Sequence, residues 1–209
     1  METPSNIQVQ STGTNSPPTK IQWKDPTEAH RTLGIHLAPK CSVDAQVHIL
    51  EQKAKAFSKS MEKSILLNVV KQTACCTCIK PSLTNPLMAH NFLPSDLQPT
   101  QTYINKIIFH SRGLNCHFPK ALTHGPLRYG SLGEGTLYAK HGVEKMAYFL
   151  HHIRNNDKGF HQLTAMLGYS QLELGSAKSM FALDYNWWGT LVTATWTTEL
   201  WHFLQEIDG

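Results

Sequence analysis

Apolar residues recur at intervals of three and four positions through most of this chain, which is the repeat of one face of an α-helix. The clearest case lies at 137–154, where the spacing is four, three, four and three positions for Ala139, Val143, Met146, Leu150 and Ile153. This spacing predicts an amphipathic helix.

Another helix is predicted at 44–63, where Leu50, Ala54 and Phe57 share one helical face and Asp44 is a suitable N-cap. Further helices are expected over residues 64–79, 98–111, 160–174 and 197–207. The helix at 64–79 is expected to end before Pro81, because the residue that precedes a proline is disfavoured in the α conformation.

One segment has the two-residue period of a β-strand. In Thr32–Ala38 the apolar residues Leu33, Ile35 and Leu37 alternate with Thr, Gly and His. Alternation with a period of two predicts a short β-strand, which Pro39 would close.

The segment Gly113–Tyr138 has neither period. It holds five glycines and two prolines and lies between two predicted helices, so it is interpreted as a shaped connector. Its GSLGEG run at Gly130–Gly135 is not a phosphate-binding loop, because no Lys-Ser/Thr pair follows and no strand precedes it. The predicted fold is therefore mainly α: an irregular helical bundle with a short N-terminal strand or hairpin and a Gly/Pro-rich central connector.

The same patterns divide the chain into three regions. Residues 1–20 are rich in Ser, Thr, Pro and Gln without any apolar period, which predicts a disordered leader. Residues 21–112 hold the predicted strand and the first helices. Residues 113–209 hold the connector and a C-terminal helical region.

Charge is sparse and unevenly distributed. Charged residues make up 16% of the chain, against about 25% in a typical soluble domain. The net charge of +4 divides into +8 for residues 1–160 and −4 for residues 161–209. The low charge implies that uncharged polar side chains form much of the surface, or that part of the surface is covered by a partner. The net positive charge of residues 1–160 favours contact with phosphate groups.

The sequence favours an intracellular protein, cytoplasmic or nuclear. Its first twenty residues lack the apolar core of a secretion signal, so we expect that it is not secreted. Its best apolar run, Ile65–Val70, is interrupted by Asn68 and is much shorter than the roughly 20 residues of a membrane span, so no membrane association is expected. Five cysteines without a secretion signal are expected to be reduced thiols.

Candidate metal ligands do not form a convincing set. Cys75 and Cys78 have CxxC spacing, but they lie inside a predicted helix without a second pair, so packing as small apolar side chains is favoured over zinc binding. His141 and His151 stand ten positions apart, which does not align them on one helical face, and they are expected at the surface or at helix ends. We predict no metal site and no cofactor.

Catalytic motifs are not found either. The sequence has no GxSxG nucleophile motif, and none of its six aspartates adjoins another acidic residue. A polymerase or nuclease centre with two metal ions needs carboxylates in nearby sets. We therefore predict that this chain is not an enzyme.

Aromatic residues gather in the acidic last part of the chain. Trp187, Trp188, Trp196 and Trp201 lie within fifteen positions of one another, and stacking on nucleic-acid bases is one use of such a cluster. Packing in the core or at a protein interface is favoured, because the surrounding acidic residues would repel phosphates. This region is the candidate for contact with a protein partner.

Two stretches resemble the reverse transcriptases of non-LTR (LINE-like) retrotransposons. Thr32–Pro39, TLGIHLAP, resembles the strand with a Leu-Gly-Val/Ile core that leaves the palm of those enzymes, just before the helix that opens the thumb. The second stretch resembles a run of Gly-hydrophobic-Asn, Phe-Pro-Arg/Lys-Ala, Gly-Pro, Tyr-Gly-Gly-Leu-Gly and Leu-Tyr. It stands here as Gly113, Asn115, Phe118–Pro119–Lys120–Ala121, Gly125–Pro126, Tyr129–Gly130, Leu132–Gly133 and Leu137–Tyr138.

The later parts of the pattern are His152–Ile153–Arg154 and Gln171–Leu172–Glu173–Leu174–Gly175, so the resemblance covers about residues 28–205. Two departures are Ser131, where the family has a second glycine, and Asn85–Pro86–Leu87, where it usually has Tyr-Pro-Leu. The resemblance implies the thumb and C-terminal connection region, with a thumb-like part at 21–112, and the fingers and catalytic palm are expected to be missing from this chain.

The resemblance implies a function in holding a DNA or RNA duplex by its phosphates, without polymerase activity. The candidate phosphate-contacting residues are Lys53, Lys59, Lys106, Arg112, Lys120 and Arg128. The alternatives are a stand-alone helical protein-interaction module and a non-functional remnant. If the palm is missing, Leu33, Ile35 and Leu37 have lost their sheet partners, and an exposed strand with marginal stability is expected.

Overall fold

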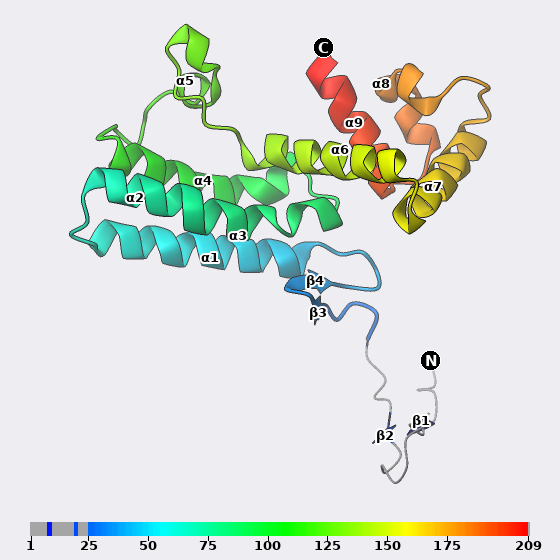
Figure 1. Ribbon diagram of the computed structural model, residues 1–209, viewed down its shortest axis with the longest axis horizontal. Coiled ribbons are helices and arrows are strands. Elements are labelled where there is room, and N and C mark those ends of the chain that lie inside the picture. The colour runs from blue at the N-terminus through cyan, green and yellow to red at the C-terminus, as the bar shows by residue number, and fades with distance from the viewer. Residues whose placement is uncertain (1–7, 10–18, 21–24, 209) are drawn as a thin grey trace.

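The computed structural model of the protein describes residues 8–9, 19–20 and 25–208. It is mainly helical, with a small two-stranded antiparallel sheet before the first long helix, so the predicted fold class is confirmed (Figure 1). Most of the predicted leader lies outside the described residues. Within it, strands β1 (Gln8–Val9) and β2 (Thr19–Lys20) pair antiparallel.

The segment predicted as one strand is a tight hairpin of β3 (His30–Thr32) and β4 (Ile35–Leu37). The hairpin alternative of the prediction is confirmed. One continuous strand over Thr32–Ala38 is wrong, because Leu33 and Gly34, with φ of 52° and 88°, form the two-residue turn between the strands. Positive φ at both turn residues matches the right-handed twist of the strands. Leu33 is consequently 95% exposed, and β4 has a pairing partner in β3, which corrects the expectation of an unpaired strand.

The first layer of helices is built on α1 (Asp44–Lys63) and α4 (Pro94–Ser111), which pack against each other (Figure 1). Leu50 and Ala54 of α1 are fully buried, as the predicted apolar face requires. α4 begins four residues earlier than predicted. Pro94 occupies its first turn, where a missing N–H costs nothing, and the Asp96 carboxylate accepts a hydrogen bond from the Leu93 N–H at 2.9 Å.

A second correction concerns the helix predicted to end before Pro81. The helical path runs through α2 (Asn68–Ala74), the π-helical turn η1 (Cys75–Ile79) and α3 (Lys80–Thr84), followed by η2 (Leu87–Ala89). The Lys80 N–H bonds to the carbonyl five residues back, on Cys75, and not to the one four back. This extra residue in the turn resets the hydrogen-bond pattern, so Pro81, without an N–H, is tolerated at the start of α3.

The connector holds two short helical pieces, α5 (Lys120–His124) and η3 (Leu127–Tyr129). α5 stands on the opposite side of α4 from α1 (Figure 1). The chain returns along α5, because the Leu132 N–H donates to the Leu122 carbonyl at 2.8 Å and the Glu134 N–H donates to the Thr123 carbonyl at 3.0 Å. Gly113, just after α4, has the left-handed φ of 66° that its predicted capping role requires.

The second layer is formed by α6 (Leu137–Asn155), α7 (Lys158–Leu174) and α9 (Trp196–Asp208). Between α7 and α9 lie η4 (Met180–Ala182), α8 (Tyr185–Trp188) and η5 (Gly189–Leu191). α7 and α9 both pack on α6, and α6 also contacts α4, so it joins the two layers. Among the residues that the structure describes, none of the helices combines the length and apolar character that crossing a membrane requires.

The buried face of α6 is largely polar. Its fully enclosed residues include His141, Gly142 and Lys145, whereas Val143 and Leu150 of the predicted apolar series are 49% and 40% exposed. The expectation that His141 lies at the surface or at a helix end is therefore wrong.

Each polar group on this face has a partner. The His141 ring Nδ1–H donates to the Leu87 carbonyl at 2.7 Å, and the Lys145 ammonium donates to the Asn91 side-chain oxygen at 2.7 Å. The Phe203 ring of α9 lies where the side chain of any other residue at position 142 would be, so only glycine fits there. These hydrogen bonds offset the free-energy cost of removing the polar groups from water.

Burial changes the protonation of both side chains. Loss of solvent lowers the pKa of His141 to about 4, and the neighbouring positive charge of Lys145 adds to this effect. The same loss of solvent lowers the pKa of Lys145 to about 8. The hydrogen bond to the Leu87 carbonyl opposes this shift, but loss of solvent outweighs it, so His141 is neutral at pH 7.

This burial predicts a loss of stability in mild acid. Because the pKa of His141 is about 4 in the folded state and 6.5 ordinarily, only the unfolded chain takes up a proton between these values. The free energy of unfolding should fall by about 3 kcal/mol as the pH drops from 7 to 4. Urea unfolding across this range measures the fall. His141→Gln should make this fall in the free energy of unfolding smaller, whereas His161→Gln, at an exposed position on α7, should leave it unchanged.

Candidate nucleic-acid interface

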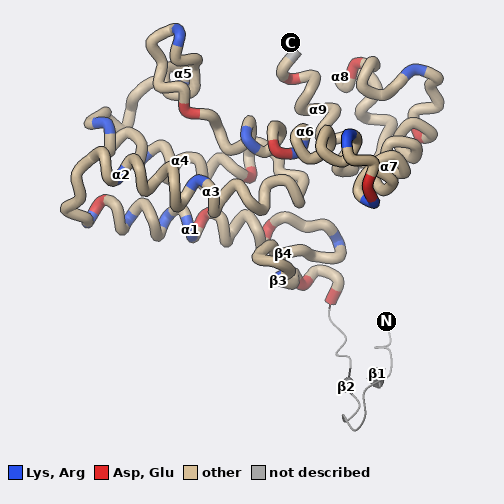
Figure 2. The backbone as a smooth tube through the Cα atoms, in the orientation of Figure 1, with Lys and Arg blue, Asp and Glu red and all other residues tan. Residues whose placement is uncertain are grey.

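The six predicted phosphate contacts lie in three different surroundings. Lys53 and Lys59 are exposed on α1, where Figure 2 shows a row of basic positions. Lys106 is exposed on α4 and forms an ion pair with Glu62 of α1, with 2.6 Å between nitrogen and oxygen. The hydrogen bond between the two side chains raises the pKa of Lys106 and lowers that of Glu62.

The remaining three residues lie on or beside the connector. Lys120 is the first residue of α5 and is exposed. The guanidinium of Arg128 lies over the Tyr129 ring, 4.8 Å from its centroid. Arg112, at the end of α4, donates to the Glu134 carboxylate at 2.8 Å and is partly buried, so its guanidinium is already engaged in an ion pair. The structure does not bring all six together.

Three adjoining hollows follow the outer side of α4, and we call them together the α4 groove. The central hollow, of about 440 Å³, is lined by Lys106 and Lys120 with Thr102 and Asn105. A hollow of about 280 Å³ adjoins it through Asn105 and Lys120, and one of about 330 Å³ adjoins it through Lys106. Two of the six predicted residues, Lys106 and Lys120, therefore line the same central hollow.

Uncharged polar groups and histidines supply much of the rest of the groove wall. His110 and His117 line its end near Lys106, and Gln98 and His124 line its end near α6. The His124 ring Nδ1–H donates to the Glu134 carbonyl at 2.6 Å, which fixes the ring on the connector. Sequence reasoning missed these residues, because nothing in their spacing shows that the chain after α4 folds back along it.

Gln101 ties the groove to the second layer. Its side-chain nitrogen donates to Asn105 at 2.7 Å, and its side-chain oxygen accepts from the Leu137 N–H at 2.7 Å. Leu137 is the first residue of α6, whose N–H has no acceptor inside the helix. Gln101 thereby fixes where α6 begins relative to α4.

Glu134 fixes the position of the connector. One carboxylate oxygen accepts from the Lys80 ammonium of α3 at 2.5 Å, and the other accepts from Arg112 at 2.8 Å. Burial acts to lower the pKa of Lys80, but the hydrogen bond and charge of Glu134 raise it above its ordinary value. The connector is thus held at once to α3 and to the end of α4, and this attachment places Lys120 beside α4.

A basic row on α1 lies near one end of the groove. Lys55, Lys59 and Lys63 are exposed and stand four positions apart, so they share one side of the helix. Lys55 and Lys63 were not among the predicted contacts, although their spacing from Lys59 would have identified them. Glu62, which lines the groove, is on the same helix and opposes their charge.

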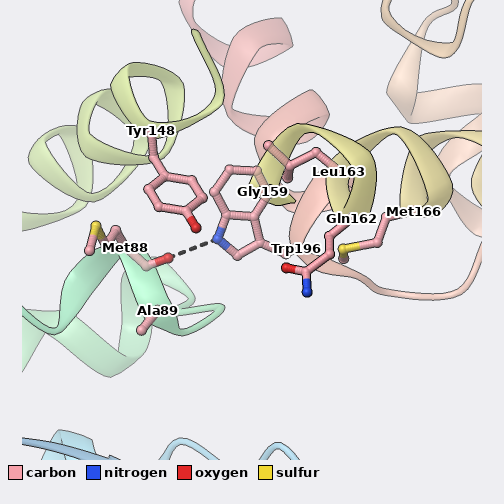
Figure 3. A pocket seen from close by; sticks show the side chains of 8 residues that line it. All are labelled: Met88, Ala89, Tyr148, Gly159, Gln162, Leu163, Met166 and Trp196. Atoms are coloured by element: carbon pink, nitrogen blue, oxygen red, sulfur yellow. Dashed lines mark hydrogen bonds between the residues drawn. The ribbon is translucent and has the colours of Figure 1, made fainter. Parts of the chain in front are cut away.

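The Trp-rich region contributes mainly to packing. Trp201 is fully buried and its N–H donates to the Leu183 carbonyl at 3.0 Å. Trp196 donates to the Met88 carbonyl at 2.8 Å and forms the wall of a hollow of about 310 Å³ together with Tyr148 (Figure 3). No charged side chain lines this hollow, so it does not suit a phosphate.

The cysteines are placed as follows. Cys75 is buried in the π-helical turn, whereas Cys76 and Cys78 are exposed. Loss of solvent raises the pKa of the Cys75 thiol to about 11. Across residues 25–208 no three side chains of His, Cys, Asp or Glu gather closely enough to hold a metal ion.

Comparison of the chain with protein-family models, with curated protein sequences and with solved structures finds no match.

The role of Glu134 can be tested without any ligand. Glu134→Gln leaves Lys80 and Arg112 half-buried without a counter-charge, which should weaken the attachment of the connector by about 2 kcal/mol. Hydrogen exchange of the Leu132 and Glu134 amides should accelerate by roughly 30-fold. Glu51→Gln, on α1 at a carboxylate without an ion pair in the described residues, is the matched control. Unchanged exchange in Glu134→Gln would show that the connector is held by other contacts.

Proposed function

We propose that this chain binds the sugar–phosphate backbone of a nucleic-acid duplex in the α4 groove, as the thumb and connection region of a non-LTR reverse transcriptase would. The observation that carries the proposal is that Lys106 of α4 and Lys120 of α5 line one hollow of about 440 Å³. Two ammonium groups facing a common groove attract the phosphates of a backbone.

The other groove residues suit contact with phosphate and sugar. Gln98 and Asn105 carry side-chain amide groups, and such groups commonly bind phosphate oxygens in nucleic-acid complexes. The Thr102 hydroxyl already donates to the Gln98 carbonyl at 2.9 Å, so it has no free proton for a phosphate. Backbone contacts of this kind position a duplex without reading its sequence. Binding should therefore depend strongly on salt and only weakly on base sequence.

Glu62 sets the strength of this attraction. Its ion pair with Lys106 is exposed, and exposed pairs contribute little to stability, so the pair can open without a large cost. A phosphate would compete with the Glu62 carboxylate for the same ammonium group. The exposed Lys59 and Lys63 on α1 would extend the contact beyond the groove.

We infer that the chain carries out no polymerisation by itself. None of its aspartates adjoins another acidic residue, whereas two-metal catalysis of nucleotide addition needs neighbouring carboxylates. Template-dependent extension of a primer by the purified protein would contradict this inference.

A second candidate function is protein interaction through the Trp-rich acidic region. The observation that favours it is Trp187, whose side chain is 79% exposed on α8, with exposed Leu191 four residues later. Exposed tryptophan is common at the centre of protein interfaces. This function predicts binding that does not involve the α4 groove.

The proposal is tested by the anisotropy of a fluorescein-labelled DNA–RNA hybrid at several salt concentrations. Lys106→Ala and Lys120→Ala should each weaken binding by roughly 5-fold at low salt and should reduce the salt slope by about 1. Glu62→Gln should strengthen binding by roughly 3-fold, because it removes the anion that competes for Lys106. Lys178→Ala, which removes an exposed charge far from the groove, is the control and should bind as the unaltered protein does.

Two results would refute the assignment. Undetectable affinity of the unaltered protein for the hybrid at low salt would remove the proposed function. If Lys178→Ala weakened binding as much as Lys106→Ala, the protein would bind through its general charge and not through the groove.

A further inference from the structure

The apolar series that identified α6 in the sequence faces away from the core. We call Ala139, Val143, Met146, Leu150 and Ile153 the α6 seam. Val143, Leu150 and Ile153 are 49%, 40% and 41% exposed, and none of the five belongs to either buried apolar cluster of the described residues. At 3.6 residues per turn, Leu150 lies about 180° around the helix axis from the buried His141.

The orientation of α6 is settled by its polar contacts and not by its apolar residues. His141 bonds to the Leu87 carbonyl and Lys145 bonds to Asn91, so these two side chains face the first layer. Gly142 receives the Phe203 ring of α9 from a second side. The seam is left on the remaining side of the helix.

The seam has the form of a helix-pairing surface. Its spacing of four, three, four and three places its residues at the a and d positions of two heptads, which is the pattern that packs one helix along another. An apolar row of this length on a water-facing helix usually marks a contact with another protein.

The charges beside the seam are mainly basic. Arg154 follows Ile153 and is exposed, and the half-buried Lys140 lies on the same flank of α6. His151 and the exposed Glu144 lie slightly further round the helix, so this flank carries two basic residues and one acidic residue. In the described residues Arg154 and Lys140 have no ion-pair partner. A partner with acidic side chains along this flank would complement both the apolar and the charged parts of the surface. A second copy of α6 would not, because antiparallel pairing places Arg154 near Lys140 of the partner subunit.

We propose that the α6 seam is the docking face for an amphipathic helix of another protein, one that carries acidic residues beside its own apolar row. Val143, Met146, Leu150 and Ile153 would pack against that apolar row, and Arg154 would pair with the acidic flank. The contact spans about four helical turns and is smaller than the roughly 1,600 Å² of a standard interface, so micromolar affinity is expected. This interaction is independent of the proposed duplex binding, because the α4 groove shares no residue with the seam.

The test uses a designed fluorescein-labelled peptide of about three heptads, with Leu at the a and d positions and Glu at the flanking e and g positions. A second peptide with Lys in place of Glu is the charge control. The full chain should bind the Glu peptide with micromolar affinity and the Lys peptide at least roughly 10-fold more weakly.

Three variants locate the contact. Leu150→Glu should weaken binding of the Glu peptide by roughly 10-fold or more, because it places a carboxylate in the seam. Arg154→Glu should reverse the preference between the two peptides. Ile65→Glu, at a fully exposed apolar position after α1, should leave binding unchanged. Circular dichroism and thermal melting confirm that each variant is folded.

Several outcomes would overturn the proposal. Equal affinity for the two peptides, or equal loss in Leu150→Glu and Ile65→Glu, would show that the seam does not select an acidic helix. Failure of both peptides to bind would also overturn it. If sedimentation shows that the chain alone dimerises and that Leu150→Glu abolishes the dimer, the seam is a self-association surface instead.

Discussion

The candidate site depends on Glu134, which forms two ion pairs. One carboxylate holds Lys80 of α3 and Arg112 at the end of α4, so the returning part of the connector is fixed against the first layer. Because α5 is hydrogen-bonded to this returning segment, Lys120 is placed beside α4 and across the groove from Lys106. Partly buried carboxylate–cation contacts are strongly destabilised when one partner is removed, which makes Glu134 the residue that shapes the groove.

The second layer depends on a different constraint, the burial of polar side chains on α6. His141 and Lys145 replace the apolar residues that a core-facing helix normally buries, and they bond to the segment that follows α3. Gly142 and Gln101 complete the attachment, one by admitting Phe203 and the other by accepting from the first N–H of α6. The cost of burying these groups is offset by specific partners, and the consequence is that the apolar seam of α6 remains on the surface.

The sequence was sufficient for the fold class and for α1, because helical spacing and the buried Leu50 and Ala54 agree. It failed where a tertiary contact overrides a local rule. Leu33 reads as a strand residue but lies in a tight turn, and the buried face of α6 cannot be foreseen because the partners of His141 are distant in the chain. The same limit applies to the candidate site. The sequence identifies which residues are cationic, but only the fold shows that Arg112 forms an ion pair with Glu134.

Lysine footprinting tests most directly the proposal that a duplex lies in the α4 groove. The protein is acetylated with and without a DNA–RNA hybrid at low salt, and the modification of each lysine is measured by mass spectrometry. If the duplex lies there, Lys106 and Lys120 should lose reactivity when the hybrid is present, whereas Lys158 and Lys178 should not, since neither lines the groove. Protection of Lys158 and Lys178, or equal reactivity of all lysines in both samples, would contradict it.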